Sequence, residues 1–187
     1  MDVQRLVASD VQRYRDLMLR AYAVAPDAFT STPEERSAEP DSWWLKRIAD
    51  PSGQSLAFGA FRDGSLVGTA TVEFSTKPKT RHKAHLVGMF VEESHRRLGA
   101  GAKLVEASLG AARARPEARL VTLTVTEGNV PAVCLYERFG FRPFGVEPMA
   151  IATPDGYKSK VHMWLLLGEY GAGAPSPSPF EPLILSG

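Results

Sequence analysis

One stretch, residues 85–112, constrains the possible folds more than any other part of the chain. Its apolar run at residues 86–91 is typical of a strand, and residues 96–102 form a glycine-containing turn into a helix. The first N–H groups of a helix have no intrahelical partner, and together with the helix dipole they favour a bound anion. Glycines let the backbone approach a phosphate closely. The stretch therefore predicts a strand, a turn and a helix that hold a phosphate-bearing ligand.

Two common phosphate-binding motifs are absent from the sequence. No G-x-x-x-x-G-K-S/T pattern occurs, which argues against a nucleoside-triphosphate loop. No G-x-G-x-x-G with a distal acid occurs either, which argues against a dinucleotide site. For the glycine turn taken alone, an ordinary connection between a strand and a helix is the alternative interpretation.

The apolar pattern elsewhere predicts a sheet protein with helices before and between its strands. Strands are expected at residues 3–7, 55–62, 66–74, 82–91, 119–126, 141–151 and 158–167. Helices are expected from Ser9 or Asp10 up to residues 25–29, at residues 43–49, from residue 101 to about 115, and at residues 130–139. Residues 30–40 are polar and contain proline, so we expect a loop there. The first two helices are expected to form one wall of a substrate cleft.

The bulk composition narrows the class of protein. A length of 187 residues fits one domain, which we place at residues 1–170, before a Gly/Ala/Pro/Ser-rich tail at residues 171–187. The net charge of +1 gives no general attraction to nucleic acid or to an anionic membrane. No apolar run approaches the about 20 residues of a membrane span, and the charged N-terminus lacks a secretory signal. The single Cys134 rules out an intrachain disulfide, so a cytoplasmic protein is expected.

A second pair of residues, Asn129 and Tyr136, lies beyond the strand at residues 119–126. They are seven positions apart, which is close to two helical turns, so both lie on one face of the expected helix. The alternative interpretation is plainer: Asn129 is a favoured N-cap residue, and Tyr136 is a core aromatic.

On these residues the chain resembles the GNAT N-acetyltransferase superfamily, which moves an acetyl group from acetyl-CoA to an amine. Its pyrophosphate pattern is Gln or Arg, two residues, Gly, one residue, then Gly or Ala, and Arg96, Gly99 and Gly101 match it. The superfamily's second signature is matched within residues 129–141, including Ala132, Tyr136, Gly140 and Phe141. The resemblance spans residues 3–168. It implies a mixed α/β fold with a mostly antiparallel, seven-stranded sheet, about four helices, and a splay where the cofactor enters.

The resemblance also implies which residues contact acetyl-CoA. Those expected at the pyrophosphate are Arg96, Arg97, Leu98, Gly99, Ala100, Gly101 and Ala102. Those expected to pair with the pantetheine arm through the main chain are Met89, Phe90 and Val91. Asn129 is expected near the cofactor, and Tyr136 is expected beside the sulfur, where it protonates the leaving thiolate. No metal is implied.

The general base is less well defined by the sequence. Some superfamily members carry a glutamate five residues before the asparagine, where this chain has Thr124. His85 lies early in the strand before the turn, and histidine titrates near neutral pH, which suits a base. Glu73 on the neighbouring strand is the second candidate. A strand-end surface histidine is the plainer interpretation of His85.

The sequence therefore predicts an acetyl-CoA-dependent N-acetyltransferase that uses direct transfer in a ternary complex. The competing hypothesis is a non-catalytic acyl-CoA-binding module. Within the enzyme class, a protein or peptide N-terminus competes with a small amine as the acceptor. Neither nucleic acid nor a membrane is expected as a partner, and both a monomer and a homodimer remain open.

Overall fold

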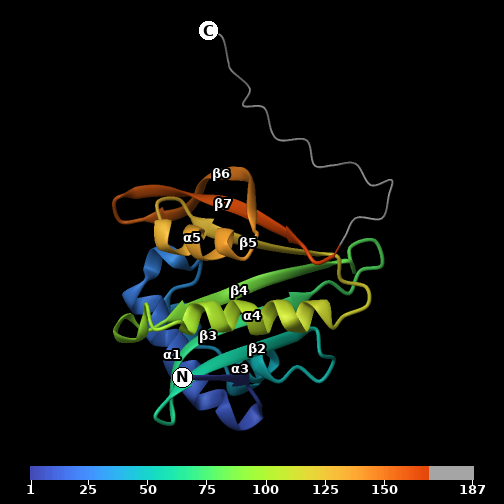
Figure 1. Cartoon of the computed structure of the whole chain (residues 1–187). Helices are drawn as coiled ribbons and strands as arrows, with labels where there is room; N and C mark the ends of the chain where they lie inside the picture. Colours follow the sequence, from blue (N-terminus) through green and yellow to red (C-terminus); the bar gives the residue numbers. More distant parts are fainter. Residues whose placement is uncertain (169–187) are drawn as a thin grey trace, which may run out of the picture.

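The computed structural model describes residues 1–168, and the expected tail at residues 171–187 lies outside the described part. The helices are α1 (Val11–Val24), α2 (Pro33–Ser37), α3 (Asp41–Ile48), α4 (Ala100–Arg113) and α5 (Val130–Arg138). The strands are β1 (Asp2–Arg5), β2 (Ser55–Arg62), β3 (Ser65–Phe74), β4 (Lys83–Val91), β5 (Leu120–Thr126), β6 (Arg142–Thr153) and β7 (Gly156–Leu166). The strands and the four longer helices confirm the predicted element order (Figure 1).

The seven strands form one sheet in the order β1-β2-β3-β4-β5-β7-β6. Every neighbouring pair is antiparallel except β4 and β5, which run parallel and are joined through α4. A parallel pair needs a crossover connection, and the strand–turn–helix unit predicted from residues 85–112 supplies it. The mostly antiparallel, seven-stranded sheet predicted from the resemblance is therefore confirmed.

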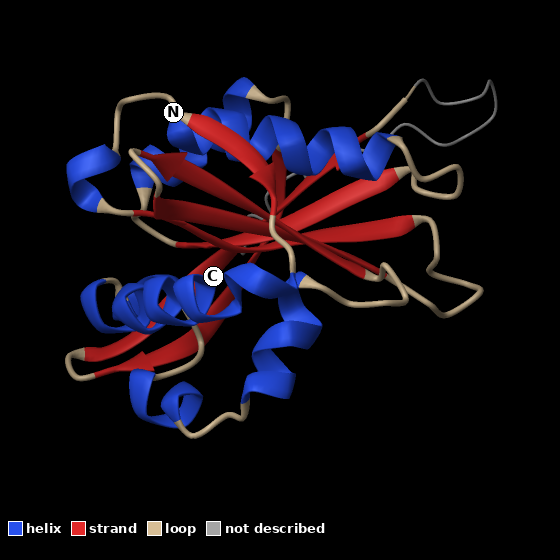
Figure 2. Cartoon of the chain, turned by 90° about the horizontal axis from the view of Figure 1, so that it is seen from below, coloured by secondary structure: helices blue, strands red, loops and turns tan. Residues whose placement is uncertain are grey.

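Helices cover both faces of the sheet (Figure 2). On one face α4 buries Leu104, Val105 and Leu109 against β3 side chains such as Val72. On the other face α1 and α3 form a second core, which holds Tyr14, Leu17, Met18, Trp44 and Ile48. The one-sided burial of α4 and α1 follows from the helical spacing of their apolar residues.

The sheet opens between its two parallel strands. The register pairs Lys83, Ala84 and His85 of β4 with Leu120, Val121 and Thr122 of β5, and it ends there. Beyond His85, β4 stays with β3, while β5 stays with β7. Because strand edges that are not paired leave N–H and C=O groups free, the diverging strands present main-chain groups to an inserted ligand.

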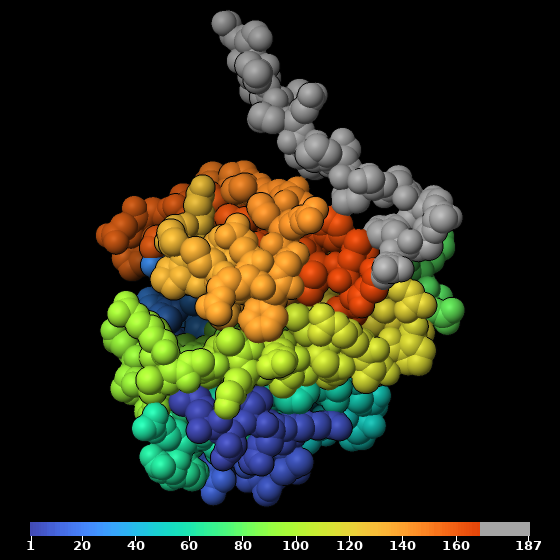
Figure 3. Space-filling view, in the orientation of Figure 1, coloured from blue at the N-terminus to red at the C-terminus, as the bar shows by residue number. Residues whose placement is uncertain are grey.

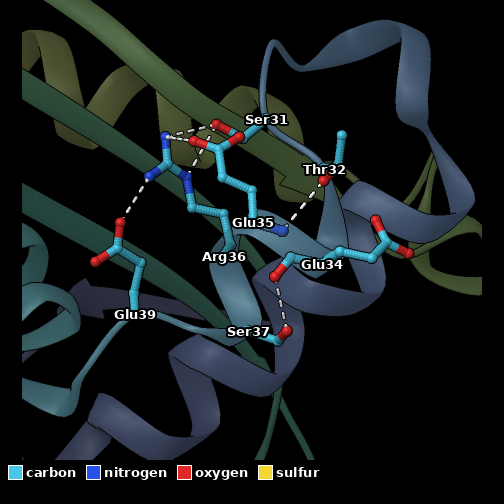
Figure 4. A network of polar contacts seen from close by, with 7 residues as sticks. All are labelled: Ser31, Thr32, Glu34, Glu35, Arg36, Ser37 and Glu39. Carbon is cyan, nitrogen blue, oxygen red and sulfur yellow. Dashed lines mark hydrogen bonds and ion pairs between the residues drawn. The ribbon is translucent and has the colours of Figure 1, made fainter.

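One expected loop contains a helix. Residues 30–40 were expected to be irregular, but Pro33–Ser37 form α2 (Figure 4). Thr32 caps this helix by accepting the Glu35 N–H at 3.2 Å, and Pro33 occupies the first turn, where its missing N–H costs nothing. The Thr-Pro-Glu-Glu sequence is thus a helix start, and Pro33 together with the following Pro40 makes the segment resemble a loop. No helix within residues 1–168 is long and apolar enough to cross a membrane.

Candidate functional site

The opened strand β4 carries a bulge at its centre. Thr71 pairs with Val87 and Thr69 pairs with Phe90, so Gly88 and Met89 together oppose one residue of β3. Gly88 has a φ of +61°, the left-handed backbone that a bulge of this kind demands of its glycine. The bulge takes main-chain groups out of the ladder and turns them towards the gap between β4 and β5.

A cavity of about 440 Å³ occupies this gap and extends under the first helices. The sheet contributes Glu73, His85, Gly88, Met89 and Thr124 to its wall. Asn129, the N-cap of α5, and Tyr136 of α5 also line it. The wall opposite comes from α1, α2 and α3 and includes Tyr22, Arg36, Trp43 and Arg47. On the molecular surface, a recess lies between the α5 segment and the start of α4 (Figure 3).

The turn before α4 has the backbone of an anion site. Arg97 and Gly99 both have positive φ, +62° and +84°, and Gly99 is the N-cap. No described side chain caps the helix, so the amides of Ala100, Gly101 and Ala102 have no intrahelical partner. A Cβ added at Gly99 would meet nothing within 4 Å, so the N-cap position itself is uncrowded. The turn lies outside the cavity wall, on the adjoining surface.

Two contacts tie this turn to the rest of the site. The Arg96 Nε donates a hydrogen bond to the Val91 carbonyl at 3.0 Å, which joins the turn to the end of β4. A Cβ at Gly101 would lie 3.2 Å from Leu135 of α5 and 3.4 Å from Met89, so glycine permits the close approach of α4 to α5. The side chain of Phe90 packs in the α1–α3 core, so only its main chain faces the opened edge.

Asn129 and Tyr136 lie on one face of α5, as their spacing predicts, and both line the cavity. The Asn129 Oδ1 accepts the Ala132 N–H at 3.3 Å, so the residue is also the helix cap of the plainer interpretation. The ring of Tyr136 is 5% exposed and packs edge-on against Phe141 at 5.7 Å. Burial raises the pKa of the Tyr136 phenol well above its ordinary value, so the group holds its proton at neutral pH.

His85 and Glu73 face one another across β4 and β3. The Nδ1 of His85 lies 2.8 Å from the Thr122 hydroxyl at the last paired position of β4 and β5. Burial lowers the pKa of His85, and the charge of Glu73 partly offsets that shift. The lowered pKa favours the neutral ring, and the structure places His85 half-buried in the cavity wall.

The helical wall holds charges that sequence reasoning missed. The guanidinium groups of Arg36 and Arg47 lie over the Trp43 ring, at 4.6 and 4.9 Å from its centre. Arg36 is held by the Ser31 hydroxyl at 2.7 Å and by Glu39 at 3.2 Å (Figure 4). Arg36 lies in α2, Trp43 and Arg47 lie in α3, and no short sequence motif joins the three residues. In the sequence, Arg36 stands four residues after Thr32, the N-cap of α2, and Trp43 stands three residues after Pro40, the N-cap of α3. This spacing is the one sequence feature that could have indicated their places in the helical wall.

Lys160 of β7 adds a further cationic group to the cavity wall, and burial lowers its pKa. Within residues 1–168, no group of three or more His, Cys, Asp or Glu side chains is placed to hold a metal ion.

Comparison with known families matches residues 14–141 to the model described as "Acetyltransferase (GNAT) family". The match covers more than half of the chain and includes the turn before α4, Asn129 and Tyr136.

Two curated relatives illustrate the range of similar sequences. An N-alpha-acetyltransferase of Sulfurisphaera tokodaii is 40% identical over 96 residues, which cover 48% of this chain and 58% of the relative. The L-amino acid N-acetyltransferase AaaT of Escherichia coli is 27% identical over 101 residues, covering 54% and 61%. The matched part thus spans less than two thirds of the length of these relatives.

Solved structures share the fold over nearly the whole chain. A phosphinothricin acetyltransferase of Sinorhizobium meliloti, in complex with AcCoA, aligns with a TM-score of 0.78 and 17% identity over 96% of this chain and 95% of its own. The yncA protein of Salmonella typhimurium, with its cofactor acetyl-CoA, aligns with a TM-score of 0.76 and 18% identity over 95% and 98%. At this identity the likeness establishes the shared architecture.

Proposed function

The chain belongs to the acetyltransferase (GNAT) family, and from this premise we propose that it transfers the acetyl group of acetyl-CoA to a primary amine. The observation that carries the proposal is the opened sheet. The bulge at Gly88, the parted strands β4 and β5, and Tyr136 all meet at one cavity beside an uncapped helix start.

The cofactor side is built mainly from main-chain groups. The free amides of Ala100, Gly101 and Ala102 suit a pyrophosphate, because helix N-termini favour anions. The edge of β4 at Met89 and Phe90 suits an extended pantetheine arm that pairs as an extra strand. The Val91 carbonyl already accepts Arg96 Nε, so in this arrangement Arg96 positions the strand end as well as the turn.

The transfer is direct, in a ternary complex. The amine nitrogen forms a bond to the acetyl carbon, and the carbonyl oxygen becomes an oxyanion, which the amides at the bulge stabilise. The carbon–sulfur bond then breaks and the thiolate leaves. Tyr136, whose phenol is protonated and faces the cavity, gives its proton to the sulfur as the general acid.

The amine must lose a proton before or during its attack. His85 is the proposed base, because its neutral imidazole lines the cavity and the Thr122 hydroxyl holds its ring at 2.8 Å. Glu73, opposite His85, is the second candidate, and its charge attracts the ammonium form of the acceptor.

A non-catalytic acyl-CoA-binding module is the competing function, and Thr124, where some superfamily members carry a glutamate, is the residue that favours it. Release of free CoA from acetyl-CoA over a panel of amines separates the two. If the protein is an enzyme, the rate of CoA release rises with the concentration of the acceptor amine, and Tyr136→Phe slows this release. Tight CoA binding without acceptor-dependent release from any amine would support the module instead.

The acceptor is a primary amine, either small or at a peptide N-terminus. Relatives with both kinds of name are found, an N-alpha-acetyltransferase and an L-amino acid N-acetyltransferase. The cytoplasmic location and a monomeric or homodimeric state are predictions from the sequence that stand beside this proposal.

A further inference from the structure

The cationic wall of the cavity is the feature that the acetyl-transfer chemistry does not use. Neither Arg36 nor Arg47 is needed to bind CoA, to activate the amine or to protonate the thiolate. Both nevertheless line the same cavity as His85 and Tyr136. The charge and hydrogen-bonding capacity of these two arginines therefore indicate what kind of acceptor occupies the remainder of the cavity.

Arg36 is already compensated within the protein. Its guanidinium contacts Glu39 at 3.2 Å, Glu35 at 3.3 Å and the Ser31 hydroxyl (Figure 4). Two carboxylates around one guanidinium leave little positive charge for a ligand. Arg36 therefore holds α2 in place and supports one face of Trp43.

Arg47 is in the opposite condition. Its side chain is 27% exposed, and its carboxylate contact among the described residues is Glu73, at 3.9 Å, which is longer than a hydrogen bond. Its Nε is buried and has no hydrogen-bond partner of normal geometry within residues 1–168, although the Tyr14 phenol lies beside it and helps to raise the pKa of the guanidinium. A buried charge is costly unless it is paired and hydrogen-bonded, so this guanidinium favours an incoming anion.

The neighbours of Arg47 set where the amine of such a ligand would lie. Glu73 is 3.9 Å from Arg47 and directly opposite His85, so a cation, an anion and the proposed base follow one another along the wall. A zwitterion matches this order, with its anionic end at Arg47 and its amine at Glu73 and His85. In an α-amino acid, a single carbon separates the two charged groups, as this short spacing requires.

We propose that the acceptor is an amino acid or a close analogue, whose carboxylate binds Arg47 and whose α-amine is acetylated between Glu73 and His85. This inference rests on the proposed function and names the acceptor of the same site. A diamine fits poorly, because Arg47 and Lys160 repel a second cationic group. A peptide N-terminus fits poorly too, since its first carbonyl is uncharged and leaves Arg47 without an anion.

Matched acceptors test the inference on the unmodified protein. Leucine, leucinamide and isopentylamine share a side chain and differ at the carboxylate, and phenylalanine, phenylalaninamide and phenethylamine form a second set. We expect kcat/KM for the free amino acid to exceed that for its amide by about 10- to 100-fold, as for hydrogen bonds to a charged group. The amide has the less basic amine, so a preference for the acid cannot arise from a larger fraction of free base.

Three variants locate the effect. Arg47→Met is expected to raise KM for leucine by at least about tenfold, with little change for leucinamide. Lys46→Met, an exposed neighbour on the same helix, is the matched control and should change neither value. Arg47→Lys keeps the charge but loses the planar fork, and it is expected to recover part of the KM for leucine.

Calorimetry separates failure of this inference from failure of the proposed function. If the protein and Arg47→Met both bind CoA, but amides, amines or leucyl peptide amides react as well as free amino acids, the amino-acid acceptor is overturned and acetyl transfer stands. Absence of any binding by leucine or phenylalanine to the CoA complex would overturn the inference as well. A protein that binds no CoA fails at the proposed function itself.

Discussion

The two sides of the cavity are built in different ways. The side proposed to bind the cofactor, β4 with α4 and α5, presents main-chain groups at a bulge, at an opened strand edge and at a helix start. The side proposed to bind the acceptor, α1 to α3, presents side chains, and the guanidinium groups of Arg36 and Arg47 lie 4.6 and 4.9 Å from the centre of the Trp43 ring. Main-chain recognition suits one constant ligand, because it depends on backbone shape. Side-chain recognition can be changed one residue at a time, which suits a variable acceptor.

The largest effect is expected at Tyr136, where the two sides meet. Tyr136→Phe keeps the ring packed on Phe141 but removes the proton donor, so kcat should fall by up to about 1000-fold. CoA affinity should be nearly unchanged in calorimetry. Tyr157→Phe, at an exposed phenol, is the control. An unchanged kcat would remove Tyr136 as the acid.

The second largest effect is expected at His85, the proposed base, which lies between the two sides of the cavity. A base must be neutral to act, so activity should rise with pH through the pKa of His85, which burial places below the usual histidine value. His85→Gln should remove this acidic limb from the pH profile of kcat/KM and lower activity at neutral pH by about 100-fold. His82→Gln, at an exposed histidine, should keep the limb. Persistence of the limb in His85→Gln would transfer the role to Glu73 or to water.

How far the sequence could predict the molecule differs between the two sides. The turn before α4 was identifiable because Arg96, Gly99 and Gly101 lie within six consecutive residues, and Gly99 meets a local need for a positive φ. The Asn129–Tyr136 pair was identifiable because helical periodicity brings both to one face. The element order followed from apolar periodicity in the same local way.

The acceptor side escaped prediction because its parts meet only in the fold. Arg47 reaches Glu73 from α3 to β3, across 26 positions of sequence, and nothing in either segment indicates the other. Helix α2 was missed because it is only five residues long, begins with Pro33 and is followed by Pro40. The bulge at Gly88 could not be predicted from the sequence, because a single glycine in an apolar run is compatible with several local structures.

A moderate effect is expected at the start of α4. Gly99→Val places a branched side chain at a φ of +84°, which costs about 1–2 kcal/mol and disturbs the free amides. CoA affinity should fall about tenfold, while KM for the acceptor changes little. Gly110→Ala, in an exposed part of the same helix, should leave CoA affinity unchanged. An unchanged CoA affinity in Gly99→Val would contradict the proposed phosphate-binding role of the turn.

The smallest effect is expected at α2. Thr32→Ala removes the cap of this short helix, which costs about 1 kcal/mol. The Arg36 amide, which donates to the Thr32 carbonyl at 3.2 Å, should exchange its hydrogen faster. KM for the acceptor should rise by less than about fivefold, with CoA affinity unchanged. Thr76→Ala, on an exposed turn, should alter none of these. A loss of CoA affinity in Thr32→Ala as large as its rise in acceptor KM would contradict the division into two sides.

The division itself is tested most directly by mapping amide signals by nuclear magnetic resonance during two successive titrations. Acetyl-CoA is expected to shift the amides of Gly88, Met89 and Ala100 to Ala102, and to leave those of α2 and α3 nearly in place. Leucine added to the protein saturated with CoA is expected to shift amides around Trp43 and Arg47. Acetyl-CoA that left the β4 bulge and the α4 start unperturbed, or acted chiefly on α2 and α3, would contradict the account.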